Sequence, residues 1–277
     1  MSIASGPGWA DNPGPRALEV RDLHVRYAGR EAWAVRSASL AVGSERVVIV
    51  GPNGSGKSTL LRAAMGLVPI DRGSVRVLGR DVRSIRGEVG VGTNLAEVYR
   101  LMTIPLGGLI RLWAQLKGCG EDRLRHEFDA FGLEEAMGRP LFRLSTGQAK
   151  LVGDLLALAG DPRLLLLDEP FDNVDFGRRR RYLERLGRVR GAIVMNTHEL
   201  DLLPSLPDWS LCFMFEGQLI GRFRTPDVDR LYVSRGLRPS ALATFDTTLG
   251  PVSVTFDDGE VPIRGASNLS YLLERIG

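Results

Sequence analysis

The sequence VVIVGPNGSGKST, residues 47–59, joins an apolar run to a glycine-rich segment that contains a single lysine. Four consecutive apolar residues are typical of a strand that is buried on both faces of a sheet. After Gly56, the segment STLLRAAMGLV places its apolar residues at helical spacing and ends near Gly66. The glycine-rich segment therefore connects a buried strand to the N-terminus of a helix.

This segment matches the phosphate-loop pattern from Gly51 to Ser58 in full. Glycines let backbone N–H groups turn toward an anion, and the positive end of the helix dipole adds to the attraction. Lys57 is predicted to reach the β- and γ-phosphates, and Ser58 to bind Mg²⁺. The alternative is an ordinary glycine-rich turn before a helix. The predicted nucleotide-binding residues of this segment are Gly51, Pro52, Asn53, Gly54, Ser55, Gly56, Lys57, Ser58 and Thr59.

A second motif, LLLLDE, occupies residues 164–169. Its leucines predict a buried strand, and ligands of open α/β sheets bind at the carboxyl ends of such strands. Asp168 is expected to hold Mg²⁺ through water, and Glu169 to orient or deprotonate the attacking water. A strand that ends in a solvated acidic turn is the alternative. Together the two motifs indicate a P-loop NTPase.

The alternation of strands and helices predicts an α/β fold with a mostly parallel sheet. Residues 18–50 favour an N-terminal antiparallel β subdomain, and residues 95–160 a helical insert. After residue 224 the long alternation of strands and helices gives way to short predicted strands. A hairpin turn is predicted at Asp258-Gly259, and a closing helix is predicted after it. The expected parts are a disordered tail (1–16), the ATPase domain (17–224) and a small C-terminal β/α extension (225–277).

Composition narrows the classes of function. The net charge of +3 is too weak to indicate nucleic-acid binding, and the four arginines at 178–181 are interpreted as the solvated start of a helix. The two cysteines are far apart, which favours neither a disulfide framework nor a zinc site. The nearly apolar stretch 101–110 is too short to span a bilayer.

The motif LSTGQ, residues 144–148, lies 20 residues before Asp168. With the phosphate loop and LLLLDE, it resembles the ATP-binding cassette (ABC) family over residues 18–222. The resemblance implies a head-to-tail dimer with two ATP molecules between its subunits. It also implies that Ser145, Gly147 and Gln148 contact the nucleotide bound by the other subunit.

The resemblance assigns roles to four further residues. Tyr27 matches the aromatic residue that stacks on adenine, with a buried core tyrosine as the alternative. Asp175 matches the loop that couples the two sites, or is a helix cap. His198 matches a histidine that contacts the γ-phosphate, or is structural. Asn94 aligns with a glutamine that contacts Mg²⁺. Its side chain is shorter, so either Asn94 serves as the ligand or a water fills the gap, and slow turnover is expected.

The resemblance further implies an ATP-hydrolysing transporter subunit, cytoplasmic and peripheral on the inner face of the membrane. Its partners would be a second copy, or a second ABC ATPase, and a membrane permease, with export favoured by the motif style. Two alternatives stay open. One is a soluble, non-transport ABC ATPase that acts on a protein scaffold, and the other is a nucleotide-binding module with little hydrolysis. Trp113 is interpreted as either a docking or a core residue, and Lys150 as a surface residue.

Overall fold

The computed structural model describes residues 16–100, 103–172, 174–248, 250–264, 266, 269, 271 and 275. These residues form two compact units, one from residues up to Arg83 together with those from Asn196 onward, and the other from Ser84 to Met195. The predicted tail, except Arg16, and most of the predicted closing helix lie outside the described residues. No helix in the described part of the chain combines the length and apolar character needed to cross a membrane.

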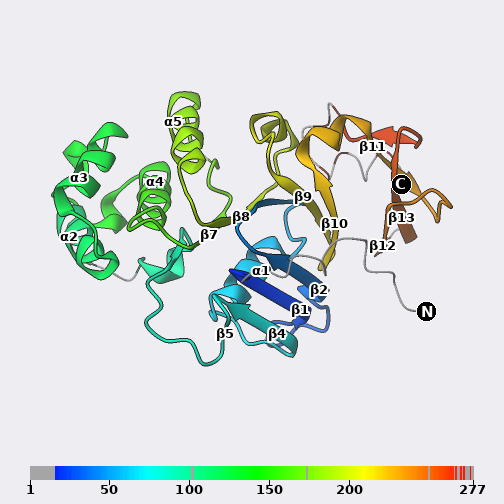
Figure 1. Cartoon of the computed structure of the whole chain (residues 1–277), viewed down its shortest axis with the longest axis horizontal. Helices are drawn as coiled ribbons and strands as arrows, with labels where there is room; N and C mark the ends of the chain where they lie inside the picture. The colour runs from blue at the N-terminus through cyan, green and yellow to red at the C-terminus, as the bar shows by residue number, and fades with distance from the viewer. Residues whose placement is uncertain are drawn as a thin grey trace. The chain divides into compact units, whose positions relative to one another are not determined.

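The first unit begins with an antiparallel sheet of strand order β2-β1-β4-β5 (Figure 1). Alternation of buried and exposed side chains along the first strand places one face toward the core, as the period-two pattern predicts. The predicted N-terminal antiparallel subdomain is therefore confirmed. Its strands are β1 (Leu18–Val25), β2 (Val35–Val42), β4 (Arg72–Val77) and β5 (Arg80–Asp81).

The first unit also carries part of the mainly parallel sheet, in the order β10-β9-β3. Strand β3 (Arg46–Val50) pairs in parallel with β9 (Ser210–Phe215), which pairs in antiparallel fashion with β10 (Gln218–Arg224). Val47 to Val50 have no exposed surface, as expected for a strand covered on both faces. The phosphate loop follows β3 and leads into α1 (Lys57–Ala64).

The second unit continues the α/β pattern with strands in the order β8-β7-β6. Its parallel β6–β7 pair confirms the predicted mostly parallel sheet. Helices α2, α3 and α4 lie together in Figure 1, as the predicted helical insert requires, although the described residues at 95–100 and 103–105 contain only a short 3-10 turn. The elements are β6 (Val91–Thr93), β7 (Leu164–Asp168), β8 (Ala192–Thr197), α2 (Leu106–Lys117), α3 (Glu121–Ala130), α4 (Thr146–Ala157) and α5 (Phe176–Gly187).

Residues after Arg224 form a third sheet, with strand order β12-β13-β11-β14. The predicted hairpin at Asp258-Gly259 is wrong, because the strands on either side of this turn do not pair with each other. Both pair with β11, on its opposite edges. The strands are β11 (Leu231–Arg235), β12 (Ala243–Thr247), β13 (Gly250–Phe256) and β14 (Val261–Pro262).

This C-terminal sheet is attached to the rest of the first unit. The rings of Phe215 and Phe245 meet edge to face at 4.2 Å between centroids. Gln218 Nε2 and Arg36 both donate to the Asp246 carbonyl oxygen, at 2.6 and 3.0 Å. The extension therefore packs on strands β9 and β10, one of the two locations expected from its small size.

Candidate functional site

The phosphate loop has little room for side chains at two of its glycines. A Cβ on Gly51 would lie 2.2 Å from the Met214 carbonyl oxygen, and one on Gly56 would lie 2.1 Å from that of Ala34. Gly56 also has a φ of 105°, which L side chains rarely adopt. These contacts explain why glycine is needed at both positions and why the loop keeps its backbone open to an anion.

Two side chains of the loop are suited to binding phosphate. Lys57 is only 5% exposed, and its Nζ donates to the carbonyl oxygens of Gly51 (2.7 Å) and Pro52 (3.1 Å). The lysine side chain therefore bends back, so that its ammonium group lies against the first two residues of the loop. The hydroxyl oxygen of Ser55 is buried and has no hydrogen-bond partner. A buried hydroxyl without a partner and a buried cation two positions further along the same loop are both expected of an oxyanion-binding loop.

Tyr27 lies close to the same loop. Its hydroxyl group is 3.1 Å from the Thr59 hydroxyl oxygen in α1, and 38% of the residue is exposed. An exposed aromatic ring tied by its polar end to the phosphate-loop helix fits a stacking surface for a base better than a core tyrosine. His198, which comes directly after the last residue of β8, belongs to the first unit and is partly exposed.

In the second unit, β7 delivers the predicted acidic pair. Leu164 to Leu167 have no exposed surface, and Asp168 ends the strand. Glu169 has a φ of 48°, in the left-handed region that costs a non-glycine residue about 1 kcal/mol or more. Such strain marks a backbone that its surroundings hold in place.

Asn94 lies beside this strand end, but its amide is engaged inside the protein. Its Oδ1 accepts from the Asp168 N–H at 2.7 Å, and its Nδ2 donates to the Asp168 carbonyl oxygen at 3.1 Å. The same Nδ2 donates to Asp154 Oδ1 at 2.6 Å. With 2% exposure, Asn94 is buried between these partners. This arrangement does not present its amide to Mg²⁺ as the sequence reasoning expected.

Asp154 is a residue that the sequence reasoning missed. It has no exposed surface, and its Oδ2 has no hydrogen-bond partner. Burial raises the pKa of this carboxyl from its ordinary 3.8 to about 7, against the lowering effects of Lys150 and of the Asn94 hydrogen bond. An acidic residue amid the apolar positions of a helix could have drawn attention to it.

Lys150 is not the surface residue that was expected. It is partly buried, and its Nζ donates to the carbonyl oxygen of Asp168. Trp113 is a core residue, 7% exposed, whose Nε1 donates to the Leu156 carbonyl oxygen at 3.0 Å. Contacts distant in sequence decided both roles.

The LSTGQ motif forms the start of α4. Ser145 caps this helix, accepting from the Gln148 N–H at 3.2 Å, while Gln148 Oε1 accepts from the Ser145 N–H at 3.1 Å. This reciprocal pair is a capping box, and it fixes the helix N-terminus where an anion is favoured. Gln148 is thus engaged at the helix end beside Gly147.

Asp175 caps α5 in a similar way, since its Oδ1 accepts from the Arg178 N–H at 3.0 Å. The arginine run that follows supports the fold. Arg178 and Arg181 donate to the carbonyl oxygens of Phe131 and Ala130, at the C-terminal end of α3. Cations at the end of a helix offset its dipole.

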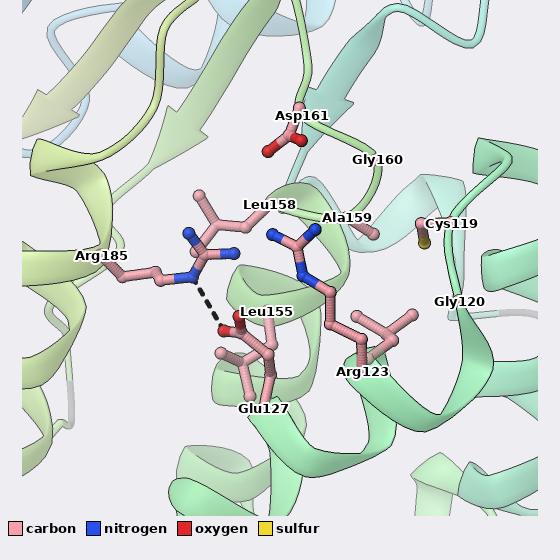
Figure 2. Close-up of a pocket in the computed structure, with 11 residues that line it drawn as sticks. Cys119, Gly120, Arg123, Glu127, Leu155, Leu158, Ala159, Gly160, Asp161 and Arg185 are labelled. Carbon is pink, nitrogen blue, oxygen red and sulfur yellow. Dashed lines mark hydrogen bonds and ion pairs between the residues drawn. The ribbon is translucent and has the colours of Figure 1, made fainter.

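Figure 2 shows a hollow in the second unit, between the ends of α3, α4 and α5. An ion pair of 2.8 Å joins Arg185 Nε to a carboxylate oxygen of Glu127, and Arg123 extends along the same hollow (Figure 2). None of the residues predicted to bind the nucleotide lines it.

Comparison with known proteins gives a consistent result. A family model described as ABC transporter matches residues 37–172. The chain is 34% identical over 202 residues to an ABC transporter ATP-binding protein of Archaeoglobus fulgidus, covering 70% of this chain and 84% of that one. It is 30% identical to a zinc import ATP-binding protein of Rhizobium etli, covering 82% and 72%.

A solved structure described as a cobalt transport ATP-binding protein is similar over almost the whole chain. The TM-score is 0.84 at 32% identity, with 94% of this chain and 100% of that chain covered. Because so little of this chain is left out, the similar region must include part of residues 225–277. The similarity therefore extends into the C-terminal sheet.

Proposed function

The chain belongs to the family of ABC transporter ATP-binding proteins and is an ATP hydrolase, and on this premise we propose that it drives uptake through a separate membrane permease. The observation that carries the ATP-driven part of the proposal is the phosphate loop, with its buried Lys57, its unsatisfied Ser55 hydroxyl and glycines that admit no side chain. The LSTGQ motif at the start of α4 supplies the second half of a site that two copies would complete.

The binding of ATP follows from these groups. The loop N–H groups and Lys57 would hold the β- and γ-phosphates, and the ring of Tyr27 would support the adenine. The Ser58 hydroxyl and the Asp168 carboxylate would hold Mg²⁺, because both are hard oxygen ligands, and the ion would neutralise phosphate charge. Among the described residues, no group of three acidic, histidine or cysteine side chains could hold a metal alone. A magnesium ion that keeps waters and phosphate oxygens as ligands suits so small a set.

Hydrolysis would use Glu169 as the general base. A water oxygen attacks the γ-phosphorus while its proton passes to the Glu169 carboxylate, and the bond to the β–γ bridging oxygen breaks to release ADP and phosphate. His198 would contact the γ-phosphate and help to fix this water. Ser145 and the Gly147 N–H of a second copy would close over the same phosphate, and Asp175 would link the two sites.

The expected export direction finds no support among the relatives. The Rhizobium etli protein is named for zinc import, and a taurine import and an Fe(3+) import ATP-binding protein also match. We therefore assign uptake rather than export to this chain. The permease would determine the substrate and would hold the chain at the inner face of the membrane.

Phosphate release tests the enzymatic part. Glu169→Gln should slow turnover about a hundredfold or more, because the amide cannot accept the proton, while ATP binding persists. An unchanged rate would remove Glu169 from the mechanism.

Co-purification tests the transport part. Expression with the membrane protein encoded beside this chain should yield a complex whose ATP turnover depends on the transported solute. Recovery of a soluble scaffold protein instead would favour the non-transport ABC ATPase.

A further inference from the structure

The main chain at Asp168 is held by side chains on both of its polar groups. Asn94 accepts from the N–H and donates to the carbonyl oxygen, and Lys150 Nζ donates to that same carbonyl oxygen. Strand pairing normally satisfies such groups through a neighbouring backbone. Here, the side chains of Asn94 and Lys150 bind the main chain of Asp168, at the point where β7 ends.

These hydrogen bonds to Asp168 also constrain the backbone of Glu169. The Asp168 carbonyl belongs to the peptide plane that joins residues 168 and 169, so fixing the oxygen fixes the orientation of that plane. Glu169 has its strained φ of 48° immediately after this plane. A strained conformation persists only where the surroundings over-determine it, and the contacts at Asp168 supply that constraint.

Asn94 is itself held in place by hydrogen bonds to Asp154 and Tyr99. Asp154 Oδ1 accepts from Asn94 Nδ2, and the Tyr99 hydroxyl group donates to the main-chain carbonyl oxygen of Asn94 at 3.3 Å. A Cβ on Gly153 would lie 2.0 Å from the Tyr99 hydroxyl oxygen, so α4 and this tyrosine are in close contact. The side chain of Asn94 therefore has one orientation, and its amide oxygen and nitrogen are both used.

We propose that Asn94 is a positioning residue, seated by Asp154 and assisted by Lys150, which aims the Glu169 carboxylate and is not a ligand of Mg²⁺. The inference rests on the proposed role of Glu169 as general base. Asp154 and Lys150 both lie on α4, the helix that Ser145 begins, so this contact also connects the LSTGQ motif to the catalytic strand end.

Asn94→Asp separates this role from metal binding. A carboxylate is a stronger Mg²⁺ ligand than an amide, so a metal-binding Asn94 would keep or improve its function as aspartate. A positioning Asn94 would lose its donor to Asp168 and would face the Asp154 carboxyl group. We expect kcat to fall about tenfold or more, as it does when a catalytic group is misplaced by about an ångström, with KM for ATP and the Mg²⁺ requirement unchanged.

Asp154 provides the second arm of the experiment. Asp154→Leu should lower kcat to about the same extent as Asn94→Ala, and the double variant should lose little more, because both act through one contact. Asp154→Asn, which keeps an acceptor for Asn94, should restore most of that loss. Trp113→Phe is the matched control, since it removes a buried hydrogen bond to α4 away from Asp168 and should leave kcat unchanged.

Hydrogen exchange without nucleotide gives a readout independent of catalysis. The Asp168 amide should exchange faster in Asn94→Ala and Asp154→Leu than in Trp113→Phe. Unchanged exchange, additive losses of kcat, or a raised Mg²⁺ requirement in Asn94→Ala alone would overturn the inference. If Glu169→Gln has no effect while exchange at Asp168 still depends on Asn94, the proposed base fails and the positioning contact stands. If Asp154→Leu does not fold, the Asn94→Asp arm decides.

Discussion

Replacing Asp154 with asparagine should remove a pH dependence from the stability of this chain. The carboxyl group has no exposed surface, and burial raises its pKa from 3.8 to about 7. An acid whose folded-state pKa is raised binds its proton more tightly in the folded state. Its contribution to stability is therefore complete below pH 3.8 and is lost as the pH rises toward 7.

The size of the effect follows from the shift. Each pKa unit corresponds to about 1.4 kcal/mol, so the full shift is worth about 4 kcal/mol. Between about pH 5 and about pH 8, the free energy of unfolding should decrease by about 3 kcal/mol on account of this group. Lys150 is the charged group that faces it from its own helix, while Tyr99 and Tyr182 face it as neutral phenols whose pKa values are raised.

Asparagine resembles the protonated acid in shape and keeps an acceptor for Asn94. Asp154→Asn and the wild type should therefore be about equally stable below pH 3.8, and the variant should be about 2 kcal/mol more stable near pH 5 and about 4 kcal/mol more stable near pH 8. Urea unfolding followed by fluorescence, with Trp113 as a buried reporter in the same unit, measures this difference. Parallel stability curves for the two proteins across this range would refute the reasoning.

Three further outcomes are expected. Gly153→Ala should lower thermal stability by about 1–3 kcal/mol, because its Cβ would overlap the Tyr99 ring, whereas Gly118→Ala, which meets no neighbour, reports only the cost of a positive φ. Lys57→Ala should abolish tight binding of a fluorescent ATP analogue, and retained binding would contradict the phosphate-loop assignment. Phe245→Ala should cost about 3–5 kcal/mol by removing the buried ring that packs on Phe215, and limited proteolysis should then cut the C-terminal sheet first.

The sequence by itself determined the features that are local in the chain. Strand β3, the phosphate loop and α1 follow one another within 19 residues, so the sequence shows the apolar run, the glycines and the helical spacing in the order of the elements that they form. The same holds for the LLLLDE strand and for the N-terminus of α4. In these segments, the backbone geometry is dictated by neighbours in sequence.

Tertiary structure decided the roles that depend on distant contacts. Asn94, Asp154 and Asp168 are widely separated in sequence, and only folding brings the amide, the buried acid and the strand end together. An alignment with a family glutamine could suggest a metal ligand at position 94, but not that its amide is already satisfied. Likewise, β13 and β14 looked like a hairpin because they are adjacent in sequence, whereas β11 pairs with both. Hydrogen-bond partners are chosen by proximity in space, which a linear pattern does not record.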